Sequence, residues 1–125
     1  MATDWDRLRG AIAGEIALPG SSGYEQARRP GIPRFDDIHP RAVVRCRTVT
    51  DVSRAIRFAR ATGTPLAVRS GGHCFAGRSS GEGIVLDVSP MRSVAVSGET
   101  AIVGAGARLG DIYDALAERD RKSVV

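Results

Sequence analysis

The chain has 125 residues, of which 42% are hydrophobic and 5% aromatic, so it can form one domain with a core of aliphatic side chains. No apolar run approaches the roughly 18 residues of a membrane span, and the N-terminus lacks the features of a secretory signal. The net charge of +4 comes from scattered arginines interleaved with acidic residues, which is not typical of a nucleic-acid-binding surface. We therefore expect a cytoplasmic protein with neither nucleic acid nor membrane as partner.

The content of cysteine and histidine argues against a metal site. Cys46 and Cys74 make neither a disulfide framework nor a CxxC pair, and His39 and His73 are the only histidines. We expect no structural zinc and no other bound metal.

Residues 1–38 are predicted to form a helix followed by an irregular segment. Asp4 can cap the helix, whose apolar face comprises Trp5, Leu8, Ala11 and Ile12. Glycines and prolines from Gly14 onward interrupt the pattern, so residues 18–33 are expected to be largely irregular.

A βαβ unit follows. The β-branched run at 42–46 predicts a buried strand, and a helix is expected to begin at Thr50 or Asp51 and to end at Gly63. A second strand at 65–68 follows almost at once. Strands joined in this way are parallel, and ligands of open α/β sheets bind at the carboxyl ends of such strands.

The pattern then changes to consecutive short strands. Strands are predicted at 84–88, 93–96 and 101–103, with a hairpin turn at 97–100. Tight connections of this kind imply antiparallel pairing. A final amphipathic helix is expected at 109–119, and the fold class is therefore α+β.

The glycine-rich segment between the strands at 65–68 and 84–88 has the composition of an anion-binding loop. Glycines allow backbone amides to approach a pyrophosphate, while arginines supply countercharge and serine hydroxyls supply hydrogen bonds. A flexible surface loop is the alternative interpretation. The candidate ligand-binding residues are Arg69, Ser70, Gly71, Gly72, His73, Cys74, Gly77, Arg78 and Ser79.

Two side chains of this loop carry further chemistry. His73 can be structural, or its neutral imidazole can serve as nucleophile, base or covalent anchor, and composition does not decide between these roles. Cys74 is more typical of a small packed side chain than of a reactive thiol, although Arg69 and His73 could lower its pKa. Cys46, in a predicted strand, is expected in the core.

A second glycine stretch lies at residues 104–110, between the last predicted strand and the final helix. Its GxGxxxG spacing is one residue longer than the usual dinucleotide-binding fingerprint, and its context is antiparallel. A tight strand-to-helix turn, facing the same ligand as the first loop, is the favoured interpretation.

Several stretches together resemble one family. The sequences PLAVRSGGH at 65–73 and GIVLDVSPM at 83–91 are similar to the N-terminal flavin domain of the berberine bridge enzyme-like oxidoreductases, which have the vanillyl-alcohol oxidase type of FAD-binding fold. Residues 24–29, 45–52 and 103–107 occupy the places of further family segments. The resemblance covers nearly the whole chain.

This resemblance implies a cofactor, a site and a reaction. FAD would bind through its pyrophosphate to the backbone of residues 70–73 and to the nearby Gly77, Arg78 and Ser79. His73 matches the histidine that many members attach covalently to the flavin 8α carbon. The implied reaction is FAD-dependent oxidation of a small-molecule alcohol or amine. Cys74 departs from the small residue that usually follows the histidine.

The resemblance also implies which part of the family's proteins the chain corresponds to. Residues 39–125 would be the first half of an FAD-binding domain, without the substrate domain or its tyrosine base, so no catalytic residue is assigned. The abrupt tail at 120–125 favours a truncated chain. The alternative function is a non-catalytic fragment that binds FAD weakly or not at all, and the sequence leaves open whether the chain is itself an enzyme.

Overall fold

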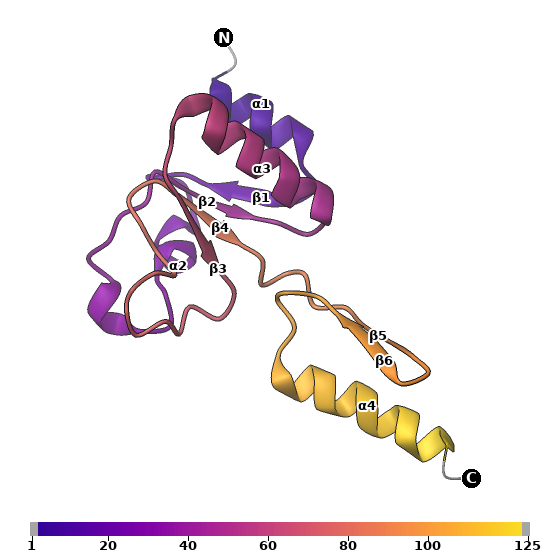
Figure 1. The fold of residues 1–125 in the computed structure, drawn as a ribbon. Helices are drawn as coiled ribbons and strands as arrows, with labels where there is room; N and C mark the ends of the chain where they lie inside the picture. The colour runs from indigo at the N-terminus through magenta and orange to yellow at the C-terminus, as the bar shows by residue number, and fades with distance from the viewer. Residues whose placement is uncertain (1–2, 124–125) are drawn as a thin grey trace.

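The computed structural model describes residues 3–123 and has two regions (Figure 1). A sheet unit contains the first four strands with their helices, and an arm projects from it. The elements in chain order are α1 (Asp4–Ala11), β1 (Glu15–Ala17), α2 (Tyr24–Arg28), the 3₁₀ turn η1 (Pro33–Phe35), β2 (Ala42–Arg45), α3 (Val49–Thr62), β3 (Leu66–Arg69), β4 (Ile84–Asp87), β5 (Val94–Ser97), β6 (Thr100–Val103) and α4 (Leu109–Ser123). Among the described helices, none combines the length and hydropathy needed to span a membrane. Val124 and Val125 of the predicted tail lie outside the described residues.

The sheet unit has a mixed sheet in the order β1-β2-β4-β3. β2 and β3 are parallel, as predicted, but β4 lies between them and pairs parallel with both. The prediction that the strand at 84–88 joins an antiparallel set is therefore wrong. β4 is buried along its whole length, because it has a partner strand on each side and cover on both faces.

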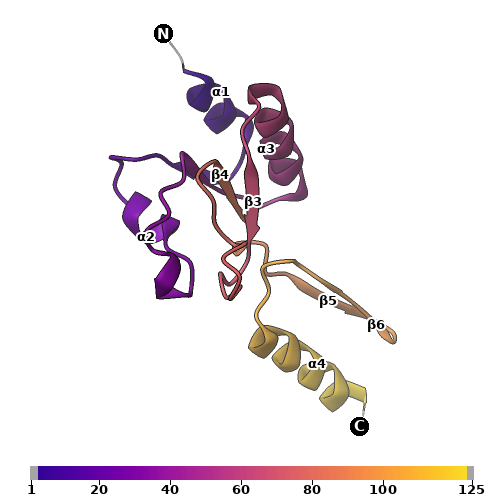
Figure 2. The ribbon, with the colours of Figure 1, turned by 60° about the vertical axis from the view of Figure 1, so that its left-hand side comes forward.

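The N-terminal residues contribute to this unit. β1 pairs antiparallel with β2, and α1 packs against α3. A three-residue strand is too short to give a pattern, so the sequence does not reveal β1. Residues 18–33, expected to be irregular, contain α2, which lies on the opposite side of the strands from α3 (Figure 2).

Local capping fixes the ends of the helices. α1 begins after Thr3, which forms a capping box with Asp6, so the predicted cap at Asp4 is one residue late. α3 begins after Thr48, whose hydroxyl accepts a hydrogen bond from the Asp51 N–H, and not at Thr50 or Asp51. Gly63 ends α3 with a φ of 62°, as predicted.

The core lies between the sheet and the pair α1 and α3. Alternate residues of the strands point into it and meet small residues of α3, which let the helix approach the sheet closely. Its buried members are Leu8, Ile16, Ala42, Val44, Cys46, Ala55, Ala59, Ile84, Leu86 and Val88. Cys46 is in the core as predicted, and burial raises the pKa of its thiol to about 12.

The buried carboxylate of Asp51 connects three segments of the sheet unit. It accepts hydrogen bonds from the N–H groups of Ala13 (2.8 Å), Gly14 (3.0 Å) and Arg47 (3.0 Å). Burial by itself would raise the pKa of Asp51, but these N–H donors and the Thr48 hydroxyl outweigh it and hold the pKa below its usual value.

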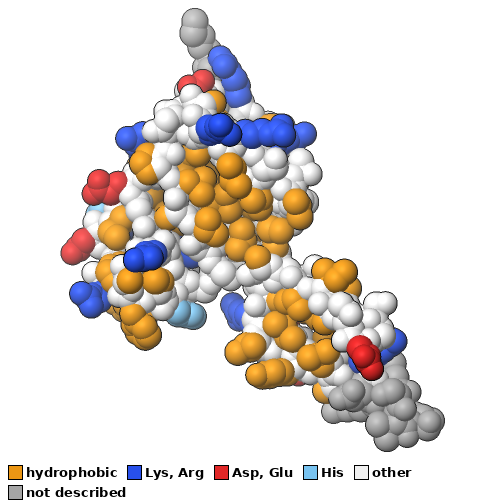
Figure 3. All heavy atoms as spheres, viewed as in Figure 1, with side chains coloured by type: hydrophobic (Ala, Val, Ile, Leu, Met, Phe, Trp, Pro, Cys, Tyr) orange, Lys and Arg blue, Asp and Glu red, His pale blue; other side chains and the backbone are white. Residues whose placement is uncertain are grey.

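The arm consists of the β5–β6 hairpin and α4. β5 and β6 are antiparallel, with Ser97 opposite Thr100 across the turn, as predicted. α4 packs against β5 and all four residues of β6 are exposed, so hydrophobic side chains remain exposed on the described part of the arm (Figure 3). The exposed ones are Ile102, Val103, Leu109, Tyr113 and Leu116.

Candidate functional site

The glycine loop leaves the sheet at the carboxyl end of β3 and returns at the start of β4. Within residues 3–123, no hydrogen-bond partner is recorded for the backbone N–H groups of Gly71, Gly72 and His73. Three successive N–H groups without a recorded partner, at the carboxyl edge of parallel strands, are donors available to an anion. Binding of a pyrophosphate by these residues stays a prediction.

Arg69 has a different role from the one predicted. It is 4% exposed, and its guanidinium donates to the carbonyl oxygens of Ala27 (2.7 Å), Arg28 (2.7 Å) and Ser79 (3.0 Å) and to the Ser80 hydroxyl (3.3 Å). Burial lowers the pKa of Arg69, an effect that Asp87 opposes. With its donors used in this way, Arg69 ties both ends of the loop to α2 and is not a free countercharge. Arg78 is exposed, and its role as countercharge stays a prediction.

Two glycines of the loop are required by its backbone conformation and packing, independently of any ligand. Gly72 (φ 74°) and Gly77 (φ 77°) have left-handed backbone. A Cβ at Gly72 would lie 2.7 Å from the Gly31 nitrogen, and one at Gly77 would lie 2.6 Å from the Phe35 ring. These glycines let the loop pack on the segment after α2, a reason for their presence that the sequence analysis did not consider.

His73 is exposed, and its imidazole lies against backbone glycines. A Cβ built on Gly31 would be 2.8 Å from Nε2, and one built on Gly71 would be 2.8 Å from Nδ1. Within residues 3–123, the structure records no hydrogen bond to either ring nitrogen. An unpaired nitrogen is available as a nucleophile or a base.

Cys74 is partly buried beside His73. The backbone N–H groups of Arg78 and Ala76 lower the pKa of its thiol, more than the charge of Arg78 does. The predicted effect on this pKa is therefore present, but it comes from amides of the loop and not from Arg69 or His73.

The second glycine stretch reaches the first loop. The Ser70 hydroxyl donates to the Ala105 carbonyl (3.0 Å), which joins the loop to the turn before α4. A Cβ at Gly106 would overlap the carbonyl oxygens of Val88 and Ser89, so glycine is required for the turn to lie against the end of β4. The favoured interpretation of a tight turn close to the first loop is confirmed in its geometry.

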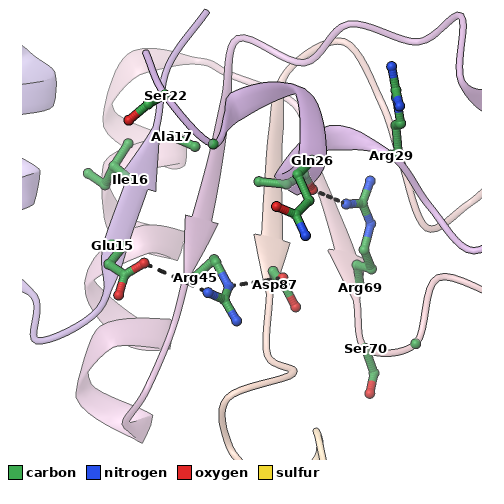
Figure 4. Close-up of a pocket in the computed structure, with 13 residues that line it drawn as sticks. Glu15, Ile16, Ala17, Ser22, Gln26, Arg29, Arg45, Arg69, Ser70 and Asp87 are labelled. Carbon is green, nitrogen blue, oxygen red and sulfur yellow. Dashed lines mark hydrogen bonds and ion pairs between the residues drawn. The ribbon is translucent and has the colours of Figure 1, made fainter.

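A row of charged side chains crosses the sheet beside the loop (Figure 4). Glu15, Arg45, Asp87 and Arg69 are register partners on successive strands. Arg45 lies 3.7 Å from Glu15 and 3.6 Å from Asp87, so charges of opposite sign alternate along the row. The row forms the floor of a cavity of about 470 Å³ that Ser70 and Gly71 also line.

This row was not among the predicted site residues, although the sequence contains a signal for it. Arg45, Arg69 and Asp87 are the last residues of three strands, and the ends of parallel strands meet at one edge of a sheet. Gly31 was also missed, because nothing in its local sequence shows that it meets His73.

The two tyrosines of the chain lie in different environments. The Tyr24 hydroxyl is buried and donates to the Pro40 carbonyl (2.6 Å), while Tyr113 is exposed on α4.

The fold and the loop are typical of a class of protein, the cofactor-binding domains that carry a glycine loop at the carboxyl edge of parallel strands. Residues 40–125 match the family described as FAD binding domain, and the chain belongs to that family. The predicted α+β FAD-binding fold is confirmed.

Known relatives agree with this assignment. The chain is 33% identical to (R)-6-hydroxynicotine oxidase of Paenarthrobacter nicotinovorans, over 82% of this chain and 23% of the oxidase. It is 36% identical to the FAD-linked oxidoreductase YvdP of Bacillus subtilis, over 85% of this chain and 24% of that protein. The solved structure of berberine bridge enzyme-like 1 of Physcomitrella patens superposes with a TM-score of 0.83 at 31% identity, over 94% of this chain and 26% of that one.

These matches confirm the predicted resemblance to berberine bridge enzyme-like proteins. They also show that the chain spans about a quarter of the length of the relatives it matches. The relatives' activities belong to proteins that contain much more than the residues described above.

Proposed function

We propose that the chain binds FAD through the pyrophosphate, at the amides of Gly71, Gly72 and His73. The observation that supports this most strongly is the set of three unpaired N–H groups held in place by the clamp of Arg69. A pyrophosphate needs several convergent donors and a positive charge, and Arg78 lies in the same loop.

The donor set fits FAD in a second respect. The cavity beside Ser70 and Gly71 is lined mainly by polar and charged groups, including Gln26, Arg29 and Asp87, which suit the hydroxyl-rich parts of a dinucleotide. When bound, the flavin would supply hydride-accepting chemistry, whereas the residues of this chain bind and orient it.

We further propose that His73 tethers the flavin. Its imidazole nitrogen would form one bond to the 8α carbon, with loss of the imidazole N–H and of one methyl C–H. The two electrons and two protons released would reduce dioxygen to hydrogen peroxide, so the step requires air. The exposed ring with unpaired nitrogens supports this role.

Expression in air with FAD, followed by acid precipitation of the purified chain, tests both parts. A yellow, fluorescent pellet is expected for the wild-type chain, and a colourless pellet with yellow supernatant for His73→Ala. A yellow supernatant from the wild-type chain would overturn the tether alone. Flavin in neither fraction would overturn FAD binding and favour the non-catalytic fragment.

For the longer proteins of this kind, we propose flavin-dependent oxidation of a small-molecule alcohol or amine. The support is that a 33% identical relative is named an oxidase and another relative an oxidoreductase. This chain would contribute the pyrophosphate and His73 part of the flavin site. Substrate oxidation by a full-length protein, abolished when Gly71→Pro removes one of the three loop N–H groups, would test the assignment.

A further inference from the structure

His73 lies in a slot between two stretches of backbone that carry no side chain. Gly31, in the segment between α2 and η1, lies along the Cδ2–Nε2 edge of the ring, and Gly71 lies along the Nδ1–Cε1 edge. A Cβ on Gly31 would lie 2.5 Å from Cδ2 and 2.8 Å from Nε2. Distances under 3.0 Å to a Cβ essentially never occur, so a side chain at position 31 and this ring orientation exclude each other.

The wall that Gly31 forms is held in place by hydrogen bonds. The Gly31 N–H donates to the Gly72 carbonyl (2.8 Å), directly beside His73. Arg69 donates to the carbonyls of Ala27 and Arg28 just before it. Residues 27–31 therefore have a fixed position relative to the loop and cannot easily move away from a clash.

Packing alone sets the orientation of the ring. Within residues 3–123, neither nitrogen of His73 has a recorded hydrogen bond that would select a rotamer. His73 is exposed as a residue, and the two glycine edges restrict the rotation of its ring.

We propose that Gly31 is a positioning residue for His73. The missing side chain opens the slot that holds the imidazole in the orientation from which it forms its bond to the flavin. The inference rests on the proposed tether and adds to it a determinant distant in sequence, outside the glycine loop.

The first test compares two single glycine substitutions, Gly31→Ala and Gly81→Ala, in the full chain. Gly81 lies at the end of the same loop, where a Cβ would make only an ordinary contact of 3.7 Å with Ala67. Tethered flavin is measured in the acid pellet at timed intervals after apoprotein and FAD are mixed in air. We expect Gly31→Ala to tether about 100-fold more slowly, as displacement of a reacting group by about 1 Å predicts, and Gly81→Ala to match the wild type.

The outcomes separate this inference from the proposed function. A wild-type chain that never tethers overturns the tether and the role of Gly31 with it. A wild-type chain that tethers, together with a Gly31→Ala variant that tethers at the same rate, overturns the role of Gly31 alone.

A second test needs no flavin. The chain has two histidines, so the imidazole resonances in a ¹H–¹⁵N spectrum report His73 with His39 as internal reference. Gly31→Ala is expected to shift the His73 ring signals and leave those of His39 in place. Unchanged His73 signals would overturn the inference.

Should Gly31→Ala fail to fold, removal of the His73 ring shows whether the clash with that ring is the cause. The double variant Gly31→Ala/His73→Ala is expected to regain most of the unfolding midpoint of His73→Ala, because the contacts under 3.0 Å are with the imidazole and the Gly71 carbonyl oxygen lies at 3.1 Å. A double variant that remains unfolded would show that position 31 acts on the fold and not on His73.

Discussion

The sheet unit and the arm differ in how they use their apolar residues. In the sheet unit, β4 is buried from Ile84 to Asp87, and helices cover both faces of the sheet. In the arm, all four residues of β6 are exposed, and α4 presents Leu109 and Tyr113 to solvent. The sheet unit therefore has a buried core cluster, and no member of that cluster among the described residues comes from the arm.

This difference explains where the candidate site lies. A loop that must hold three amides at fixed spacing benefits from a rigid support, and the glycine loop is attached to the closed unit through Arg69. The arm meets the loop through the hydrogen bond from Ser70 to Ala105. We therefore expect substitutions in the sheet unit to affect both folding and cofactor binding, and substitutions in the arm to affect them little.

The largest difference in stability is expected between two Ile→Ala substitutions, one in each region. Ile84 is 0% exposed and Ile102 is 73% exposed. Ile84→Ala should lower the free energy of unfolding by about 2–5 kcal/mol because it leaves a cavity in the core. Ile102→Ala should change it by less than about 0.5 kcal/mol. Urea denaturation followed by circular dichroism measures both, and equal losses would contradict the contrast.

The next effect concerns the buried carboxylate of the sheet unit. Asp51→Asn should cost about 3 kcal/mol, because hydrogen bonds from three N–H groups to a charged acceptor are weakened. Since folding lowers the pKa of Asp51, its contribution is complete above the pKa of the unfolded chain and is lost as the pH falls through the folded pKa. Denaturation of both proteins between pH 7 and pH 3 should show the difference between them shrinking toward acid. A difference independent of pH would be inconsistent with a charged Asp51.

Substitution of two arginines should distinguish a residue that stabilises the loop from one that only contacts the ligand. Arg69→Gln should lower the free energy of unfolding by about 2 kcal/mol, because buried carbonyls lose their donors, and should weaken FAD binding as well. Arg78→Gln, at an exposed position, should leave stability within about 0.5 kcal/mol and weaken FAD binding alone. Thermal unfolding and FAD titration of each variant measure the two effects. Loss of stability in Arg78→Gln would assign it a structural role instead.

The smallest effect is expected where the two regions meet. Ser70→Ala removes the hydrogen bond to Ala105 and should cost about 0.5–1.5 kcal/mol at most, since the group is exposed. Hydrogen exchange at the turn before α4 should become faster in this variant, with exchange in β4 unchanged. Faster exchange throughout β4 would mean that the arm supports the sheet unit more than its contacts indicate.

The contrast between the regions also explains what the sequence could predict. The hairpin at β5 and β6 follows from local turn chemistry, and α3 follows from its apolar periodicity and Gly63. The parallel pairing of β4 depends on a long-range choice. The connection from Arg69 to Ile84 exceeds the roughly dozen residues that a parallel crossover needs. Its length therefore favours parallel pairing, even though the two strands follow one another in the sequence.

For the site, residue types were predictable and their partners were not. The loop from Ser70 to Ser79 was located by its glycines and its place after a strand. The burial of Arg69 against α2, and the contact of Gly31 with His73, join segments some 40 residues apart in the chain. No local pattern encodes such contacts, because they depend on how α2 docks on the sheet.

The proposed binding of the FAD pyrophosphate by the loop amides is tested most directly by a titration of the full 125-residue chain with FAD, in which flavin fluorescence reports binding. His73→Ala is the suitable variant, because no tethered flavin can occupy its site, and ADP and riboflavin serve as probes. If the amides of residues 71–73 hold the pyrophosphate, ADP should displace FAD and riboflavin should bind far more weakly than FAD. Riboflavin binding as tightly as FAD, or FAD that ADP fails to displace, would contradict the binding of the pyrophosphate by these amides.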